Sequence, residues 1–337
     1  MPPLRRIAIL AFDDVQSLDV TGPVEVFSLA VRLAGARYET SLVAAGTGPV
    51  RTSSGLTLVP DRALADFSGP LDTLVVAGGW GVRDAARDPE TVAWVRAAAA
   101  RSRRVASVCT GAFLLARAGL LDGRRATTHW SSCARLAREH PAVEVVTDAI
   151  YVRDGNVYTS AGVSTGIDLA LALVEEDLGR RVALDIARSL VVYIRRSGAQ
   201  PQLSAGLAAA SAGSAALGPL LEWMAEHLEG DLSVLQLAQR AFLSPRHFAR
   251  VFKREVGVAP GAYVESLRLE RAQALLATTD LSVEEVARQC GFGTVETMRR
   301  SFGRRLGATP GAYREPGALG APAPGGPAVV PLRRSAA

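Results

Sequence analysis

The strongest constraint on this chain is a unit of about 50 residues that occurs twice in its last third. With one residue inserted at the turn of the second copy, the matching positions are 231–234 with 280–283, Ala238 with Ala287, Arg250 with Arg300, Phe252 with Phe302, Gly257 with Gly307, and 260–263 with 310–313. Self-similarity at a fixed period marks a repeated supersecondary unit. The C-terminal part is therefore predicted to contain two similar units in succession.

Each copy has the pattern of a helix, a tight turn and a second helix. Ser233 and Ser282 are typical N-cap residues, and residues 282–285 (Ser-Val-Glu-Glu) have the spacing of a capping box. Residues 244–245 (Ser-Pro) begin a second helix with a cap and a first-turn proline. Residues 291–293 (Gly-Phe-Gly) predict the corresponding turn in the other copy. This is the helix-turn-helix arrangement, in which the second helix enters the major groove of DNA.

The placement of charge supports DNA binding better than its total does. Residues 218–315 carry 13 Lys or Arg and 12 Asp or Glu, a net charge of only +1. The alternative interpretation is two solvated helix faces on an all-α domain, but both copies concentrate basic residues on the second helix. The residues predicted to contact DNA are Ser244, Arg246, His247, Arg250, Lys253, Thr294, Glu296, Thr297, Arg299, Arg300 and Arg304.

A long apolar-striped segment, residues 263–277, is predicted to be the helix that joins the two units. It would separate them by about one DNA turn, ~34 Å. Residues 218–315 resemble the AraC/XylS family of regulators, whose DNA-binding domain has this bipartite arrangement. The family's C-terminal signature is matched from residues 287–292 (Ala-Arg-Gln-Cys-Gly-Phe) to 310–313 (Pro-Gly-Ala-Tyr).

The first ~195 residues alternate between strand-like and helix-like segments. This order predicts an α/β domain with a largely parallel sheet sandwiched by helices, of flavodoxin or glutaminase type. Expected strands are 7–12, 38–44, 73–77, 105–108 and 143–147, with a hairpin over 151–159; expected helices are 20–31, 91–100, 111–118, 131–139, 165–178 and 182–194.

Residues 105–113 (Val-Ala-Ser-Val-Cys-Thr-Gly-Ala-Phe) have the pattern of a strand, a sharp turn and a helix, with Cys109 at the turn. A cysteine at a helix N-terminus is placed where the helix dipole favours the thiolate, as in a nucleophile elbow. The simpler interpretation is a small residue packed at the end of a central strand. The glycine-rich loop at 78–81 could line the same pocket or be only a tight turn.

Together with this turn, residues 19–27 and 127–130 (Thr-Thr-His-Trp) resemble the ThiJ/PfpI superfamily, which is similar to class I glutamine amidotransferases. The resemblance spans residues 5–190 and, joined to an AraC-type domain, indicates GlxA-like regulators. It implies a pocket formed by Cys109, Asp19, Thr110 and His129. Asp19 could equally cap the following helix, and His129 could be a packed histidine.

Three functions are compatible with such a pocket: a sensor of a small, nitrogenous metabolite, an active cysteine-dependent hydratase or amidase, and a redox sensor that oxidises Cys109. We favour a sensor without enzymatic activity, because catalysis requires a base within hydrogen-bond reach of the nucleophile, which no sequence pattern supplies. Cys133 and Cys290 are expected to be structural, and the scattered histidines predict no metal site. No cofactor is expected.

The resulting expectation is a bacterial, cytoplasmic regulator, because the three cysteines predict no disulfide framework and no signal peptide or membrane span is apparent. Its expected partners are promoter DNA, a small effector and a second copy of the chain, with RNA polymerase as a further candidate and no membrane. The predicted divisions are a sensor domain (1–196), a linker (197–217), the DNA-binding domain (218–315) and a disordered tail (316–337).

Overall fold

The computed structural model describes residues 3–192, 198, 202 and 217–314. The chain divides into two compact units, of which the first ends at Gln202 and the second contains the described residues from Leu217 onward. The predicted linker falls mostly outside the described residues, and the predicted tail, 316–337, does so entirely.

The first unit is built on a seven-stranded sheet with the strand order β10-β11-β7-β6-β1-β2-β5. All neighbouring strands are parallel except β10, which pairs antiparallel with β11 at one edge. The strands are β1 (Arg5–Leu10), β2 (Tyr38–Ala44), β5 (Arg62–Ala63), β6 (Leu71–Val76), β7 (Ser102–Val108), β10 (Tyr151–Asp154) and β11 (Val157–Ser160).

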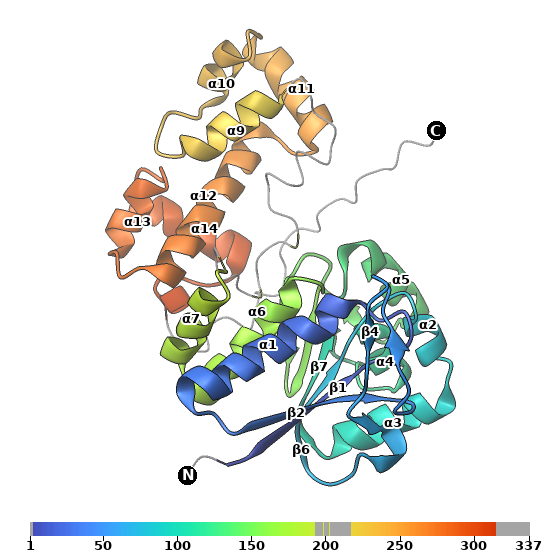
Figure 1. Ribbon diagram of the computed structural model, residues 1–337. Helices are drawn as coiled ribbons and strands as arrows, with labels where there is room; N and C mark the ends of the chain where they lie inside the picture. Colours follow the sequence, from blue (N-terminus) through green and yellow to red (C-terminus); the bar gives the residue numbers. More distant parts are fainter. Residues whose placement is uncertain (1–2, 193–197, 199–201, 203–216, 315–337) are drawn as a thin grey trace. The chain divides into compact units, whose positions relative to one another are not determined.

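Helices cover both faces of this sheet, because the central strands are apolar on both sides. One face packs against α1 (Ser17–Ala34), α6 (Thr165–Leu178) and α7 (Arg180–Ser189), and Figure 1 shows α1 and α6 lying across it. The other face packs against α2 (Val82–Ala85), α3 (Pro89–Ala100), α4 (Gly111–Arg117) and α5 (Cys133–Glu139). The predicted α/β sandwich is confirmed.

Several predicted boundaries in this unit are wrong. The helix expected over 131–139 is a 3-10 turn (Trp130–Ser132) followed by α5. The strand expected over 143–147 is only β9 (Glu144–Val145), which pairs with β8 (Arg125–Ala126) outside the main sheet. The helix expected over 182–194 is α7, which ends at Ser189; residues 193–194 lie outside the described part. The short strands β3 (Val50–Arg51) and β4 (Thr57–Leu58) carry too few residues for a periodic signal.

The described part of the second unit is helical, as predicted. It contains α9 (Gly218–Glu226), α10 (Val234–Arg240), α11 (Pro245–Val256), α12 (Pro260–Thr278), α13 (Val283–Gln289) and α14 (Val295–Leu306). In the repeat, α10 and α11 correspond to α13 and α14, and α12 joins the two pairs (Figure 1). The buried aromatic residues Phe252 and Phe302 pack edge-on against Tyr263 and Tyr313 in their respective copies.

The predicted N-caps are present in both copies. The hydroxyl oxygens of Ser233 and Ser282 accept hydrogen bonds from the backbone N–H groups of Gln236 and Glu285, at 3.4 and 3.1 Å. The Glu285 carboxylate accepts hydrogen bonds from Arg288 and Gln289. The return half of the predicted capping box is therefore not formed among the described residues.

The two helix-turn-helix turns have the same backbone conformation but different residues. Phe242 in the first copy has φ +55°, and Gly291 in the second has φ +72°. In each copy this residue donates its N–H to the carbonyl three residues before it, and the next residue donates to the carbonyl five before it. The left-handed conformation suits glycine, and a side chain there is strained.

Candidate functional site

Cys109 occupies a sharp turn between β7 and α4. Its backbone has the left-handed conformation, with φ +55°, and its N–H donates to the Ser160 carbonyl at 3.0 Å. Two glycines crowd its side chain: a Cβ atom at Gly78 or Gly162 would lie 2.8 or 2.2 Å from the Cys109 Cβ atom. The turn thus depends on close backbone approach from two distant segments, and Cys109 as a residue is only 8% exposed.

Asp19 lies in the first turn of α1 and is fully buried. Its carboxylate accepts hydrogen bonds from the N–H of Gly78 at 3.0 Å and from the N–H of Val163 at 2.8 Å. Val163 also has a left-handed backbone, with φ +53°, which is strained for a β-branched residue. Burial raises the pKa of Asp19 to about 6, although the two N–H groups oppose the shift.

The surroundings of Cys109 favour the protonated thiol over the thiolate that a helix N-terminus would favour. Burial, followed by the negative charge of Asp19, raises the pKa of the Cys109 thiol to about 12. Hydrogen bonding to Thr110 lowers it, but by less. Cys109 is therefore a neutral thiol at neutral pH.

Thr110 holds the glycine-rich loop in place beside this turn. Its hydroxyl accepts the N–H of Gly79 at 2.9 Å and donates to the carbonyl of the same residue at 3.0 Å. A Cβ atom at Gly81 would lie 1.8 Å from the carbonyl oxygen of Asp13, so this loop packs too tightly to accept side chains there. The hydroxyl of Thr110 thus has a positioning role.

His129 does not join this group by any hydrogen bond among the described residues. Its Nδ1 atom lies 2.8 Å from the Ser131 hydroxyl oxygen, and burial lowers the pKa of its imidazole. Its neighbour Thr128 instead reaches the turn, because the Thr128 hydroxyl donates to the Cys109 carbonyl at 2.8 Å. Sequence reasoning missed Thr128; the only available signal was its place in the Thr-Thr-His-Trp motif.

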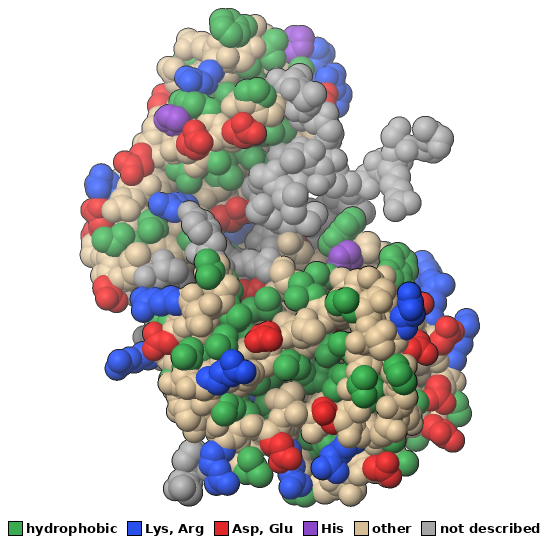
Figure 2. Space-filling view, in the orientation of Figure 1, with side chains coloured by type: hydrophobic (Ala, Val, Ile, Leu, Met, Phe, Trp, Pro, Cys, Tyr) green, Lys and Arg blue, Asp and Glu red, His purple; other side chains and the backbone are tan. Residues whose placement is uncertain are grey.

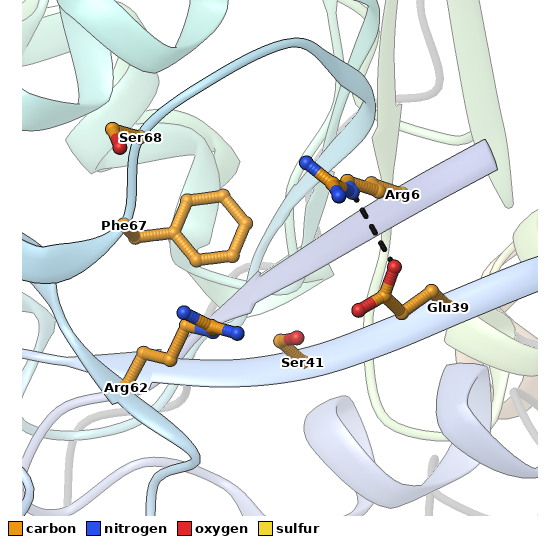
Figure 3. Close-up of a pocket in the computed structure, with 6 residues that line it drawn as sticks. All are labelled: Arg6, Glu39, Ser41, Arg62, Phe67 and Ser68. Atoms are coloured by element: carbon orange, nitrogen blue, oxygen red, sulfur yellow. Dashed lines mark hydrogen bonds and ion pairs between the residues drawn. The ribbon is translucent and has the colours of Figure 1, made fainter. Parts of the chain in front are cut away.

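Figure 3 shows a separate surface pocket in this unit, in which Arg6 and Glu39 form an ion pair across neighbouring strands. It is lined by Arg6, Glu39, Ser41, Arg62, Phe67 and Ser68. Arg6 and Glu39 lie near the beginnings of their strands, whereas Cys109 follows the end of β7. None of the residues predicted for a site lines this pocket.

The predicted DNA-contacting residues of the first copy lie on the exposed side of α11. Phe248 and Phe252 are buried in the core, whereas the basic side chains face outward, and Figure 2 shows basic side chains at the surface near α11. The exposed residues are Ser244, Arg246, His247, Arg250 and Lys253. The Ser244 hydroxyl is used as the N-cap of α11, since it accepts the N–H of His247 at 3.4 Å.

On α14 the predicted residues divide into two groups. Thr294, Glu296, Arg299 and Arg300 are exposed, whereas Thr297 is half-buried and hydrogen-bonded to Thr294. Arg304 and the adjacent Arg305 form ion pairs with Glu265 of α12. Arg304 thus contacts α12 through an ion pair that the sequence did not predict, but its side chain stays 60% exposed, so this pair does not exclude the predicted DNA contact.

No cluster of His, Cys, Asp and Glu that could hold a metal ion exists among the described residues. Within the same part of the chain, no helix is both long and apolar enough to cross a membrane.

Comparison with protein families identifies both units. Residues 5–176 match the DJ-1/PfpI family, and residues 237–316 match a helix-turn-helix domain. The HTH-type transcriptional regulator CdhR of Pseudomonas aeruginosa is 33% identical over 90% of this chain and 91% of its own. The chain belongs to the DJ-1/PfpI family. Within that family it is a transcription regulator with an AraC-type DNA-binding domain, as the repeat predicts.

Two further relatives match the DJ-1/PfpI unit. Isonitrile hydratase of Pseudomonas putida is 38% identical over 58% of this chain and 80% of its own. The crystal structure of a ThiJ/PfpI family protein from Pseudomonas syringae covers 56% of this chain and 76% of its own, with a TM-score of 0.52 and 32% identity. Because CdhR matches nearly the whole chain and the hydratase matches only part of it, the comparisons identify the chain as a transcription regulator.

Proposed function

We propose that the DJ-1/PfpI unit binds a small nitrogenous metabolite beside Cys109 and Asp19, and that this binding changes how α11 and α14 engage promoter DNA. The observation that carries the proposal is the buried Asp19 carboxylate beside a neutral thiol. An ionisable group with a pKa strongly perturbed by desolvation marks a candidate binding site.

The chemistry of the pair favours binding over catalysis. A thiol with a pKa of about 12 is a poor nucleophile at neutral pH, because the thiolate is the reactive form. Asp19, with a pKa of about 6, is mostly ionised at pH 7, and its buried negative charge would favour a cationic amine or amidine beside Cys109 without direct contact. The similarity of this unit to isonitrile hydratase, whose name denotes a nitrogen-containing substrate, points to the same ligand class.

Strain supports a functional role for the turn. Cys109 and Val163 both have a left-handed backbone conformation although neither is glycine. Each such residue destabilises the fold by about 1–3 kcal/mol. The Asp19 carboxylate accepts the backbone N–H of Val163, and Cys109 packs tightly against Gly78 and Gly162. Residues held in such conformations cluster at ligand sites and switches.

For the DNA-binding unit we propose contacts from the exposed polar and basic residues of α11 and α14, with domain limits at 1–196 and 218–315. A homodimer would present two such units to a promoter, as do other helix-turn-helix regulators.

A thermal-shift screen of the full-length protein against nitrogenous metabolites tests the effector proposal. A binder should raise the melting temperature of the wild type but not that of Asp19→Ala. As a control, Asp84→Ala removes a carboxylate from an exposed pair and should respond as the wild type does. Mass spectrometry of the recovered ligand would contradict a pure sensor if the ligand were converted.

A further inference from the structure

Gln202, the last residue of the first unit, is tied directly to the Thr127–Thr128 segment. Its side-chain Nε2 atom donates to the Thr128 carbonyl at 2.9 Å and to the Thr127 hydroxyl at 3.2 Å. Its backbone N–H donates to the Asp148 carboxylate at 3.2 Å. Beyond Gln202 the chain leads toward the DNA-binding unit.

Thr128 is the residue that the Cys109 turn and Gln202 share. Its hydroxyl donates to the Cys109 carbonyl at 2.8 Å, while its own carbonyl accepts from Gln202. The same carbonyl faces the Cys133 thiol at 3.5 Å. Because Thr128 is fully buried, a shift of the Cys109 turn acts on the acceptor that holds Gln202.

A second contact fastens the chain just before Gln202. The Gly198 carbonyl accepts the N–H of Ile150 at 3.0 Å, and a Cβ atom at Gly198 would lie 2.6 Å from the Tyr151 carbonyl oxygen. The fastening is incomplete, since the Oε1 atom of Gln202 is buried without a hydrogen-bond partner among the described residues. An unsatisfied buried acceptor offsets part of the gain from the donors, so the attachment can be released at small cost.

We infer that Gln202 is a positioning residue that couples the Cys109 turn to the chain segment leading into the DNA-binding unit. The inference deepens the proposed function and rests on it, because it names how occupancy of the pocket reaches the second unit. Coupling of this kind is reciprocal, so a change at Gln202 must alter the pocket.

The test is site-resolved alkylation of the full-length protein with iodoacetamide at pH 9, followed by peptide mass spectrometry. Gln202→Ala removes the link to Thr128 and should speed alkylation of Cys109 and Cys133 about 3- to 10-fold. Cys290, buried in the other unit, reports general unfolding and should react as in the wild type. Gln202→Glu, which keeps the size but replaces the donor, should behave like Gln202→Ala.

The matched control is Gln289→Ala, which removes the same amide side chain from α13 and should leave Cys109 unchanged. Unchanged alkylation of Cys109 in both Gln202 variants would overturn the inference, and so would a parallel acceleration at Cys290. Neither result would contradict the proposal that an effector binds, which the thermal-shift screen tests separately. Conversely, if the thermal-shift screen finds no binder while Gln202→Ala still speeds alkylation of Cys109, that result would support the coupling but not the proposed effector.

Discussion

The carboxylate of Asp19 accepts the backbone N–H of Val163 at 2.8 Å, so that the first turn of α1 holds a strained residue 144 positions later in the chain. The same carboxylate accepts the N–H of Gly78. Three segments that carry the candidate pocket therefore meet at one buried charge. This charge makes the stability of the unit depend on pH.

Asp19 should destabilise the fold as pH rises from about 4 to about 6. Its pKa is about 6 in the folded chain, against 3.8 for the ordinary side chain, so over this range the folded state retains a proton that the unfolded chain has lost. The difference corresponds to about 3 kcal/mol at pH 7. Urea unfolding at pH 4 to 7 should show this loss in the wild type and not in Asp19→Ala. Parallel pH profiles for the two proteins would contradict the raised pKa.

Cys109 should react with iodoacetamide at pH 7 about a thousandfold more slowly than a free cysteine, because so little of it is thiolate. Its rate should rise about tenfold per pH unit up to about pH 11. Asp19→Ala removes a negative charge and should increase the rate at any given pH. Cys290, whose pKa burial also raises to about 12, should be unaffected by that substitution. Rapid reaction of Cys109 at pH 7 would contradict the raised pKa and would favour a nucleophilic role for the thiol.

Asp177→Ala should be strongly destabilising. Asp177 Oδ2 lies 2.7 Å from Arg104 Nη2, and both side chains are at most 2% exposed. Removing the carboxylate leaves a buried guanidinium without its main partner, which costs about 3–5 kcal/mol. Chemical denaturation measures the loss; Asp84→Ala, which breaks the exposed pair with Arg87, should cost less than about 0.5 kcal/mol. Equal losses of unfolding free energy in Asp177→Ala and Asp84→Ala would mean that burial does not determine how much an ion pair contributes to stability.

The sequence predicted those features that depend on local pattern. Strand 38–44 and helix 165–178 were correct to the residue, because a short strand-like run and a helical spacing correspond directly to β2 and α6. The turn at Cys109 was also predicted, since strand, small residues and helix follow one another along the chain.

What the sequence could not predict depends on contacts between distant segments. The pKa of Cys109 follows from burial and from Asp19, which lies 90 residues earlier. Arg104 sits in an apolar strand, and nothing nearby in the sequence points to Asp177 as its partner. The same limit applies to the ion pair between Arg304 and Glu265, which lie 39 residues apart in the sequence. The turn at Phe242 could not be recognised from a glycine, although Phe242 has the same left-handed backbone conformation as Gly291.

Phe242→Gly should stabilise the second unit by about 0.5–1 kcal/mol. The left-handed backbone conformation destabilises a non-glycine residue by about 1–2 kcal/mol, and glycine removes this strain. Part of the stabilisation is lost again, because glycine gives the unfolded chain more conformational freedom. Little packing is lost, because the Phe242 side chain is 95% exposed. Chemical denaturation followed by a probe in this unit measures the change. The reverse exchange, Gly291→Phe, is a contrasting variant: its Cβ atom would lie 1.9 Å from the Leu228 carbonyl oxygen, so it should be destabilising.

Arg250→Ala and Arg300→Ala should each weaken promoter binding without lowering stability. Both side chains are exposed on second helices, and no described residue forms an ion pair with either. Loss of a base contact would cost about 1–3 kcal/mol, and loss of a phosphate contact would reduce the salt slope by about 1. Fluorescence anisotropy at several salt concentrations measures both. Arg288→Ala, which removes an exposed arginine of α13 bound to Glu285, is the matched control and should bind as the wild type does. Arg304→Ala, which removes an exposed ion pair with Glu265, should lower stability by less than about 1 kcal/mol. If Arg250→Ala and Arg300→Ala bind with wild-type affinity and salt slope, α11 and α14 are not the helices that enter the groove.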